Sequence, residues 1–184
     1  MSQYPDVVVV VRHAEKDGNS YQAGLTAFGG TQAQITGRWL RKSFKLGFAN
    51  NITTNLRRTR HTFRKMCPGV AFTEDWRINE CGSNRGDGSN DCGFDEKVRK
   101  IQYRIRPFCE SLSRFADSSV LIVAHSGSIC AMRKEIEGIS TKDACKVRPE
   151  NASVTIYLKK DGKLRLQTFN FIPWKVCMGK IVEI

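Results

Sequence analysis

Two histidines each follow directly after an apolar segment of the sequence. Val7–Val11 is followed by Arg12 and His13, and Val120–Ala124 is followed by His125. Segments that are apolar on both faces are typical of central strands in a parallel sheet, and ligands bind beyond the carboxyl ends of such strands. The sequence therefore predicts that both imidazoles lie at a ligand site.

Arginines and a carboxylate accompany these histidines. Arg57 and Arg58 follow the next predicted strand, and Glu80 lies at the start of an irregular segment. A guanidinium group keeps its charge and matches phosphate oxygens, and a neutral imidazole can attack phosphorus. A single histidine at a strand end is more often structural, so the combination of groups carries the inference. It favours transfer of a phosphoryl group.

The predicted elements alternate between strands and helices. Helices are expected from the N-cap Thr26 to about residue 44, at 56–66 and at 128–137. Strands are expected at 7–11, 51–54, 70–73 and 120–124. A hairpin joined through Asp161-Gly162 is expected from 154–158 and 164–169. This order predicts a three-layer α/β/α fold with a mostly parallel central sheet and an edge hairpin near the C-terminus.

The segment between the second and third of these helices has two parts. Residues 76–93 are rich in Gly, Asn, Asp and Ser, which predicts an irregular loop whose side chains from 79 to 93 shape the entrance to the site. Residues 94–115 have the clearest helical spacing of apolar residues in the chain, and Pro107 is expected to kink or break this helix.

Length and composition limit the class of protein. The chain has 184 residues, 40% of them hydrophobic, which suits a single domain over 1–184. No apolar run approaches the roughly 20 residues of a membrane span, and a strand begins by Val7, so a cytoplasmic location is expected. The seven cysteines include no Cys-x-x-Cys pair, which favours reduced thiols over a disulfide framework or a zinc ribbon.

The chain is strongly basic. Thirty Lys and Arg residues against eighteen Asp and Glu give a formal net charge of +12, which attracts anionic partners. We expect a phosphorylated substrate. A nucleic-acid partner is less favoured because no RNA-recognition signature or paired zinc ligands are present. The oligomeric state is left open. Two groups of basic residues follow predicted helices: Arg38, Arg41, Lys42 and Lys45, and Arg57, Arg58, Arg60, Arg64 and Lys65.

Four segments resemble the histidine phosphatase superfamily of phosphoglycerate mutase-like proteins. Arg-His-Ala-Glu at 12–15 resembles the Arg-His-Gly signature, and 25–29 resembles the Leu-Thr-x-x-Gly helix start. Residues 56–62 are similar to the Leu-x-Arg-Ala-x-x-Thr segment, which aligns Arg58 rather than Arg57 with a phosphate-binding arginine. Residues 123–127 are similar to the segment with the second histidine. Ala14 and Ser126 replace glycines but remove no charged group.

One branch of the superfamily is a further resemblance. Residues 78–80, 150–155 and 169–173 resemble segments of the mitochondrial serine/threonine phosphatase branch related to phosphoglycerate mutase. This resemblance implies a phosphoprotein substrate. Mutases carry a longer insertion before the second histidine, whereas Glu80 and His125 are about 45 positions apart here, which favours hydrolysis.

The resemblance also implies a mechanism. His13 attacks phosphorus to form a phosphohistidine, and Glu80 protonates the leaving oxygen and then deprotonates the attacking water. No metal and no cofactor is required. Backbone N–H groups near Gly127 are expected to add phosphate donors. The implied phosphate-binding side chains are those of Arg12, Arg58, His125 and Ser126.

Other functions are weighed against this interpretation. Residues 124–128 lack the outer glycines of a serine-hydrolase elbow, and no histidine follows His125. A zinc site from His13, His61 and His125 lacks the short ligand pairs of known zinc sites, so His61 is expected near the mouth of the pocket. A phosphatase of small-molecule, nucleotide or RNA phosphates, and a noncatalytic phosphate-binding module of the same fold, remain alternatives.

Overall fold

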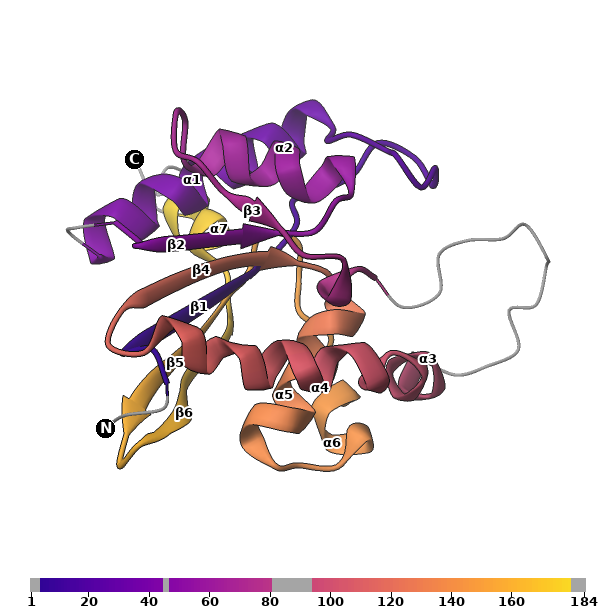
Figure 1. Cartoon of the computed structure of the whole chain (residues 1–184). Coiled ribbons are helices and arrows are strands. Elements are labelled where there is room, and N and C mark those ends of the chain that lie inside the picture. The colour runs from indigo at the N-terminus through magenta and orange to yellow at the C-terminus, as the bar shows by residue number, and fades with distance from the viewer. Residues whose placement is uncertain (1–3, 45–46, 81–93, 180–184) are drawn as a thin grey trace.

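A mixed six-stranded sheet forms the centre of the computed structural model, which describes residues 4–44, 47–80 and 94–179 (Figure 1). The strand order is β3-β2-β4-β1-β5-β6. Neighbouring strands from β3 to β1 are parallel, and β5 and β6 are antiparallel to their neighbours. The strands are β1 (Val7–Arg12), β2 (Asn50–Thr53), β3 (Thr73–Glu74), β4 (Ser119–Ala124), β5 (Val154–Lys160) and β6 (Lys163–Phe171).

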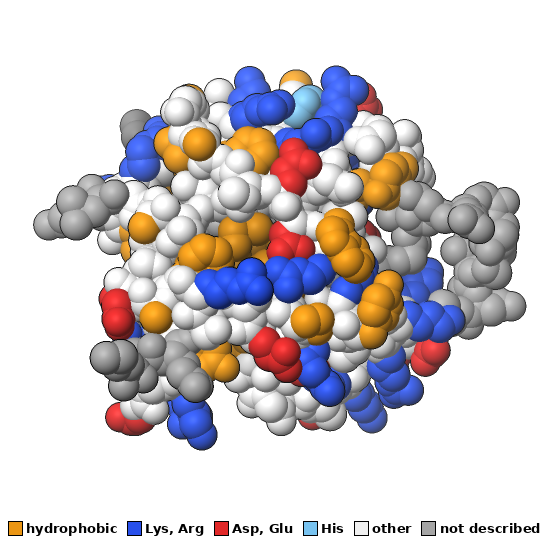
Figure 2. All heavy atoms as spheres, viewed as in Figure 1, with side chains coloured by type: hydrophobic (Ala, Val, Ile, Leu, Met, Phe, Trp, Pro, Cys, Tyr) orange, Lys and Arg blue, Asp and Glu red, His pale blue; other side chains and the backbone are white. Residues whose placement is uncertain are grey.

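Helices cover both faces of this sheet, which confirms the predicted three-layer α/β/α fold (Figure 1). One layer consists of α1 (Ala27–Ser43), α2 (Arg57–Met66) and α7 (Pro173–Gly179). The opposite layer consists of α3 (Phe94–Lys100), α4 (Gln102–Ser111), α5 (Ser126–Glu137) and α6 (Thr141–Cys145). Two short 3₁₀ turns are η1 (Trp76–Ile78) and η2 (Leu112–Phe115). In the same view, Lys and Arg side chains gather over α2 (Figure 2).

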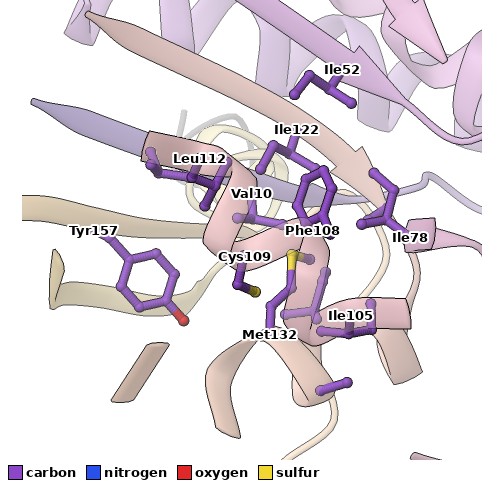
Figure 3. Close-up of a cluster of buried hydrophobic side chains, with 14 of the residues drawn as sticks. Val10, Ile52, Ile78, Ile105, Phe108, Cys109, Leu112, Ile122, Met132 and Tyr157 are labelled. Carbon is purple, nitrogen blue, oxygen red and sulfur yellow. The ribbon is translucent and has the colours of Figure 1, made fainter. Parts of the chain in front are cut away.

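The valines of β1 fill the core on both sides of the sheet. Val8 and Val10 pack with Phe108 of α4 in one cluster, part of which is drawn in Figure 3. Val9 and Val11 pack under α1 and α2 in the other cluster. All four valines are at most 1% exposed. Burial of each side chain contributes about 1.5 to 3 kcal/mol relative to an exposed one. This burial holds β1 in place in the sheet, and His13, which follows it, is held with it.

The start of α1 packs against the loop that follows β1. The Thr26 hydroxyl accepts a hydrogen bond from the Gly29 N–H, as predicted for an N-cap. A Cβ atom at Gly29 would overlap the carbonyl oxygen of Glu15. The glycine therefore lets helix and loop approach closely, and this contact helps to position the residues just after β1.

Several predicted boundaries are corrected. The helix predicted over 94–115 consists of α3, α4 and η2, and its break lies at Ile101 rather than at Pro107, which is inside α4. Ile101 has ψ near 0°, and this turns the chain between two shorter apolar faces. The strand predicted at 70–73 is shifted to Thr73–Glu74, and Val70 is exposed. Helix α5 begins two residues earlier than predicted.

Other expectations agree with the structure or lie beyond it. The hairpin is present, and Asp161 and Gly162 have φ angles of 51° and 72°, as its tight turn requires. The entrance loop predicted at 79–93 lies, from residue 81 onward, outside the described residues. Within the described ranges, no helix is both long and apolar enough to cross a membrane, and the cysteines there are free thiols.

Candidate active site

The two strand-end histidines lie side by side. β1 and β4 pair in parallel with Arg12 opposite Ala124, so His13 and His125 leave the sheet at the same edge. Their ring centroids are 5.1 Å apart, with an angle of 61° between the ring planes. His13 is 3% exposed and His125 is fully buried. The parallel register of two valine-rich strands thus places two imidazoles in one buried site.

The ring of His13 is held with a defined nitrogen available. Its Nδ1 lies 2.8 Å from the carbonyl oxygen of Ala14, so Nδ1 carries the proton and Nε2 keeps its lone pair. The backbone carbonyl of His13 accepts a hydrogen bond from Asn151 Nδ2 at 3.0 Å. Burial, followed by the charge of Arg12, lowers the pKa of His13 to about 3. The imidazole is therefore neutral at physiological pH and can act as a nucleophile.

Thr54 and Thr59 define the proton position on His125. The Thr59 hydroxyl donates to the Leu56 carbonyl at 2.8 Å, and Thr54 Oγ1 lies 2.7 Å from Thr59 Oγ1. Because the Thr59 hydroxyl proton points to that carbonyl, the proton between the two hydroxyls belongs to Thr54, which donates to Thr59. The Thr54 oxygen can then only accept from the Nε2–H of His125, at 3.1 Å. Burial, and then the charges of His13 and Arg58, hold the pKa of His125 well below its ordinary value. Neutral His125 therefore has its lone pair on Nδ1.

Two arginines lie beside these rings, Arg58 buried and Arg12 half-buried. Arg12 Nη1 donates to the Pro149 carbonyl at 2.7 Å, and Arg58 Nη1 donates to the Tyr21 carbonyl at 2.9 Å. Within the described ranges neither guanidinium forms an ion pair with a carboxylate. Arg57 is exposed on the other side of α2, so the helix turns only the second arginine of the pair into the site.

Unpartnered polar atoms are concentrated here. Among the residues that the structure describes, four buried atoms without a hydrogen-bond partner belong to this group: Arg12 Nε, Arg58 Nε, His125 Nδ1 and Ser126 Oγ. Buried polar groups in folded proteins normally have a partner, so a cluster of unpartnered ones indicates a site completed by a polar ligand. Two fixed positive charges in the cluster select an anion.

Glu80 lies at the first turn of α5. Its Oε1 accepts a hydrogen bond from the Gly127 N–H at 3.0 Å, where the helix dipole favours a negative charge. It also lies within electrostatic range of Arg12 and Arg58. From the sequence we expect the Gly127 N–H to donate to a phosphate. In this structure it donates to the carboxylate of Glu80 instead.

Arg104 of α4 is a residue of the site that the sequence analysis missed. It is 7% exposed, and its Nη1 donates to the carbonyls of Trp76 at 3.3 Å and Arg77 at 2.5 Å. Its Nη2 donates to the carbonyl of Glu80 at 3.0 Å. One buried side chain therefore fastens the turn that carries Glu80. The available signal was an arginine on the apolar face of a helix, next to Ile105.

His61 does not join the other histidines. It lies part-exposed on α2, and its Nε2 accepts from Arg57 Nε at 3.4 Å. In the described part of the chain, no three His, Cys, Asp or Glu side chains are grouped as metal ligands.

Sequence comparison links part of this site to a known family. The model of the histidine phosphatase superfamily (branch 1) matches residues 82–172, a range that contains His125 but not His13. Phosphoglycerate mutase 2 of Saccharomyces cerevisiae is 32% identical over 76 residues. That match covers 38% of this chain and 24% of the yeast enzyme, so it spans about a quarter of the relative's length.

Comparison of structures extends the likeness to most of the chain. A mycobacterial glucosyl-3-phosphoglycerate phosphatase superposes with a TM-score of 0.73 at 21% identity, covering 90% of this chain and 99% of that one. A phosphoserine phosphatase mutant from Entamoeba histolytica, in complex with phosphoserine, superposes with a TM-score of 0.68 at 15% identity, covering 89% and 96%. These likenesses show the fold. The match to the family model covers just under half of the chain, and the part of the site that precedes residue 82 lies outside that match.

Proposed function

We propose that this protein is a metal-independent phosphatase that hydrolyses phosphomonoesters through a phosphohistidine on His13. The observation that carries the proposal is the pairing of a neutral, buried imidazole with two guanidinium groups, that of Arg58 buried and that of Arg12 half-buried. His13 keeps an available Nε2 lone pair, and Arg12 and Arg58 supply charge that no carboxylate neutralises in the described structure.

The first step transfers the phosphoryl group to the enzyme. Nε2 of His13 forms a bond to phosphorus while the bond from phosphorus to the ester oxygen breaks. Protonated Glu80 gives its proton to the departing oxygen, so the alcohol leaves neutral and Glu80 becomes a carboxylate. The hydrogen bond from the Gly127 N–H then stabilises this negative charge.

The second step returns the enzyme to its starting state. The Glu80 carboxylate takes a proton from a water molecule, whose oxygen attacks phosphorus as the bond between phosphorus and His13 Nε2 breaks. Inorganic phosphate leaves, and His13 is again neutral. In both steps the equatorial phosphate oxygens gain negative charge, which fixed donors stabilise without reorganisation. The proposed donors are Arg12, Arg58 and Ser126. His125 joins them through Nδ1 when the charge of the bound phosphate favours a second proton on its ring.

The proposed substrate is a serine or threonine phosphoprotein. Support comes from the resemblance of residues 78–80, 150–155 and 169–173 to the serine/threonine phosphatase branch. The second candidate is a phosphatase of small phosphate esters. It is favoured by the folds of the glucosyl-3-phosphoglycerate phosphatase and the phosphoserine phosphatase, which match nearly their whole length.

Assays on the purified protein test the reaction class and then the substrate. We expect release of phosphate from p-nitrophenyl phosphate in the presence of EDTA, and loss of this activity in His13→Ala. Activity that vanishes with chelator, or that survives in His13→Ala, would contradict the proposal. Phosphopeptides, sugar phosphates and nucleotides at equal concentration then separate the two substrate classes by kcat/KM.

A further inference from the structure

Helix α2 carries a row of positive side chains on the side that faces away from the core. Arg58, Thr62 and Phe63 point inward and are buried. Four of the five side chains of α2 that are not buried form what we call the basic face of α2: Arg57, His61, Arg64 and Lys65. The same helix thus contributes one arginine to the phosphate site and several cationic groups to the surface next to it.

The charge of this face is not neutralised within the described structure. Arg57, Arg64 and Lys65 make no ion pair with a carboxylate in the described ranges. Arg60, at the margin, pairs with Glu74 at 3.4 Å, and both side chains are about one-third exposed, which makes this a weak interaction. Burial, and then the charges of Arg57 and Arg64, lower the pKa of His61. An anionic partner would lower the energy of repulsion between these like charges.

The basic face begins at the rim of the catalytic site. The Arg57 N–H donates to Gln22 Oε1 at 3.3 Å, and Arg58 donates to the Tyr21 carbonyl, so one loop joins the face to the phosphate site. An open hollow of about 440 Å³ lies further along α2 and is lined by Gln34, His61, Arg64, Lys65 and Pro68. Lys and Arg side chains flank histidine surface in this region, at the top of Figure 2.

The length of the face fits a short stretch of extended chain. At a rise of about 1.5 Å per residue, the eight steps from Arg57 to Lys65 span about 12 Å. An extended peptide covers this distance with three to four residues, at about 3.3 Å each. A substrate whose phosphate lies at His13 could therefore place acidic side chains a few residues away along the face.

We propose that the basic face of α2 binds an acidic segment of a phosphopeptide substrate, within about four residues of the phosphorylated residue. The proposal rests on the phosphatase function above, because the phosphate fixes the position of the peptide. Single-stranded nucleic acid fits less well, because its binding sites use exposed aromatic rings for stacking. Beside this face, the ring of Phe72 is covered by the guanidinium of Arg64, 5.7 Å from its centroid, and Tyr21 in the adjoining loop is exposed but offers one ring rather than a row of them.

The test compares two phosphopeptides of equal length. One has aspartates at the third and fourth positions from phosphoserine on both sides, and the other has asparagines there. We expect wild-type kcat/KM to be about tenfold higher for the acidic peptide, as two to three exposed ion pairs would give. The triple variant R57Q/R64Q/K65Q should reduce this ratio to about one, and added salt should reduce it in the wild type.

A matched control removes the same charge elsewhere. Lys160, Lys163 and Arg165 lie at the β5–β6 hairpin, which projects from the amino end of β1, opposite to the edge where His13 lies. The variant K160Q/K163Q/R165Q should keep the tenfold ratio. Equal loss in both variants would show a general charge effect and overturn the proposal. A wild-type ratio near one, or a ratio that survives in the α2 variant, would overturn it as well.

A binding assay separates this proposal from the phosphatase function. If the wild type hydrolyses no phosphomonoester, the proposed function fails, and fluorescence anisotropy with the labelled, unphosphorylated acidic peptide then decides about the surface. Weaker binding by the α2 variant than by the hairpin variant supports the docking surface, and equal binding overturns it. Tighter binding of a single-stranded oligonucleotide than of the acidic peptide would also overturn it, in favour of nucleic acid.

Discussion

The buried guanidinium of Arg104 donates a hydrogen bond to the backbone carbonyl of Glu80 at 3.0 Å. Glu80 follows the short turn η1 and is not part of a helix or strand, so its position depends on contacts of this kind. Arg104 fastens the same turn at two further carbonyls, those of Trp76 and Arg77. The proposed general acid is therefore held by a side chain of α4, in the same helical layer as the α5 N-terminus that its carboxylate contacts.

Replacement of Arg104 should affect proton transfer to the leaving group. We expect Arg104→Met to slow hydrolysis of alkyl phosphates by about 10- to 100-fold and that of p-nitrophenyl phosphate much less, because nitrophenolate leaves without a proton. Arg104→Lys should recover part of the loss. Arg106→Met, on the exposed side of the same helix, is the matched control. Equal slowing with both leaving groups would mean that Arg104 stabilises the fold and does not position the general acid.

Glu80→Gln should show the same dependence on the leaving group, in a stronger form. The amide cannot donate a carboxylic proton, so we expect a loss of about 10²- to 10⁴-fold with alkyl phosphates and a smaller one with p-nitrophenyl phosphate. The double variant Glu80→Gln/Arg104→Met should be no slower with alkyl phosphates than Glu80→Gln, because Arg104 acts through Glu80. If the losses of the two single variants add in the double variant, Arg104 and Glu80 act independently, and the prediction is wrong.

Oxyanion binding should depend on Arg58 and not on its neighbour. Vanadate or phosphate at about 100 times its dissociation constant stabilises a protein by about 2.7 kcal/mol, which raises the Tm measurably. We expect Arg58→Gln to abolish most of this rise, because Arg58 Nε is buried without a partner in the described structure. Arg57→Gln should retain it. A rise that survives in Arg58→Gln would place the anion elsewhere.

Acid should destabilise the protein through its buried histidines. The folded-state pKa values of His13 and His125 lie below the unfolded value of 6.5. The unfolded chain therefore binds more protons as the pH falls below 6.5, and stability decreases in that range, down to about pH 3 for His13. At pH 5 each buried neutral histidine costs about 2 kcal/mol relative to pH 8.

His125→Asn should remove one of these costs. The free energy of unfolding, measured in urea, should fall between pH 8 and pH 5 in both proteins. We expect it to fall by about 2 kcal/mol less in the variant than in the wild type. His61→Asn, at a part-exposed position, should change much less. The same pH dependence in wild type and His125→Asn would show that His125 is already protonated in the folded protein.

The strand ends and their histidines were predictable because their signals are local. Five consecutive valines specify a strand buried on both faces, and the residue after such a strand must lie at its carboxyl end. The role of Arg104 was not predictable in this way. It depends on how α4 packs against a turn 24 positions earlier in the sequence, and a helical pattern records only that position 104 faces the core.

Other differences have similar causes. The chain turns at Ile101, whose ψ is near 0°, whereas Pro107 fits inside α4 despite its missing N–H. The carboxylate of Glu80 takes the Gly127 N–H because the turn after η1 meets the first turn of α5, a tertiary contact between distant segments. Local patterns thus placed the residues that strands and helices carry, and missed those that act across layers.

Trapping of the phosphoenzyme tests the central claim most directly. The protein is mixed with a radiolabelled phosphomonoester, quenched in alkali within the first turnovers, digested and analysed by mass spectrometry. The account predicts acid-labile, alkali-stable phosphate on the peptide that contains His13, and no label in His13→Ala. Label on another residue, or label that persists in His13→Ala, would contradict it.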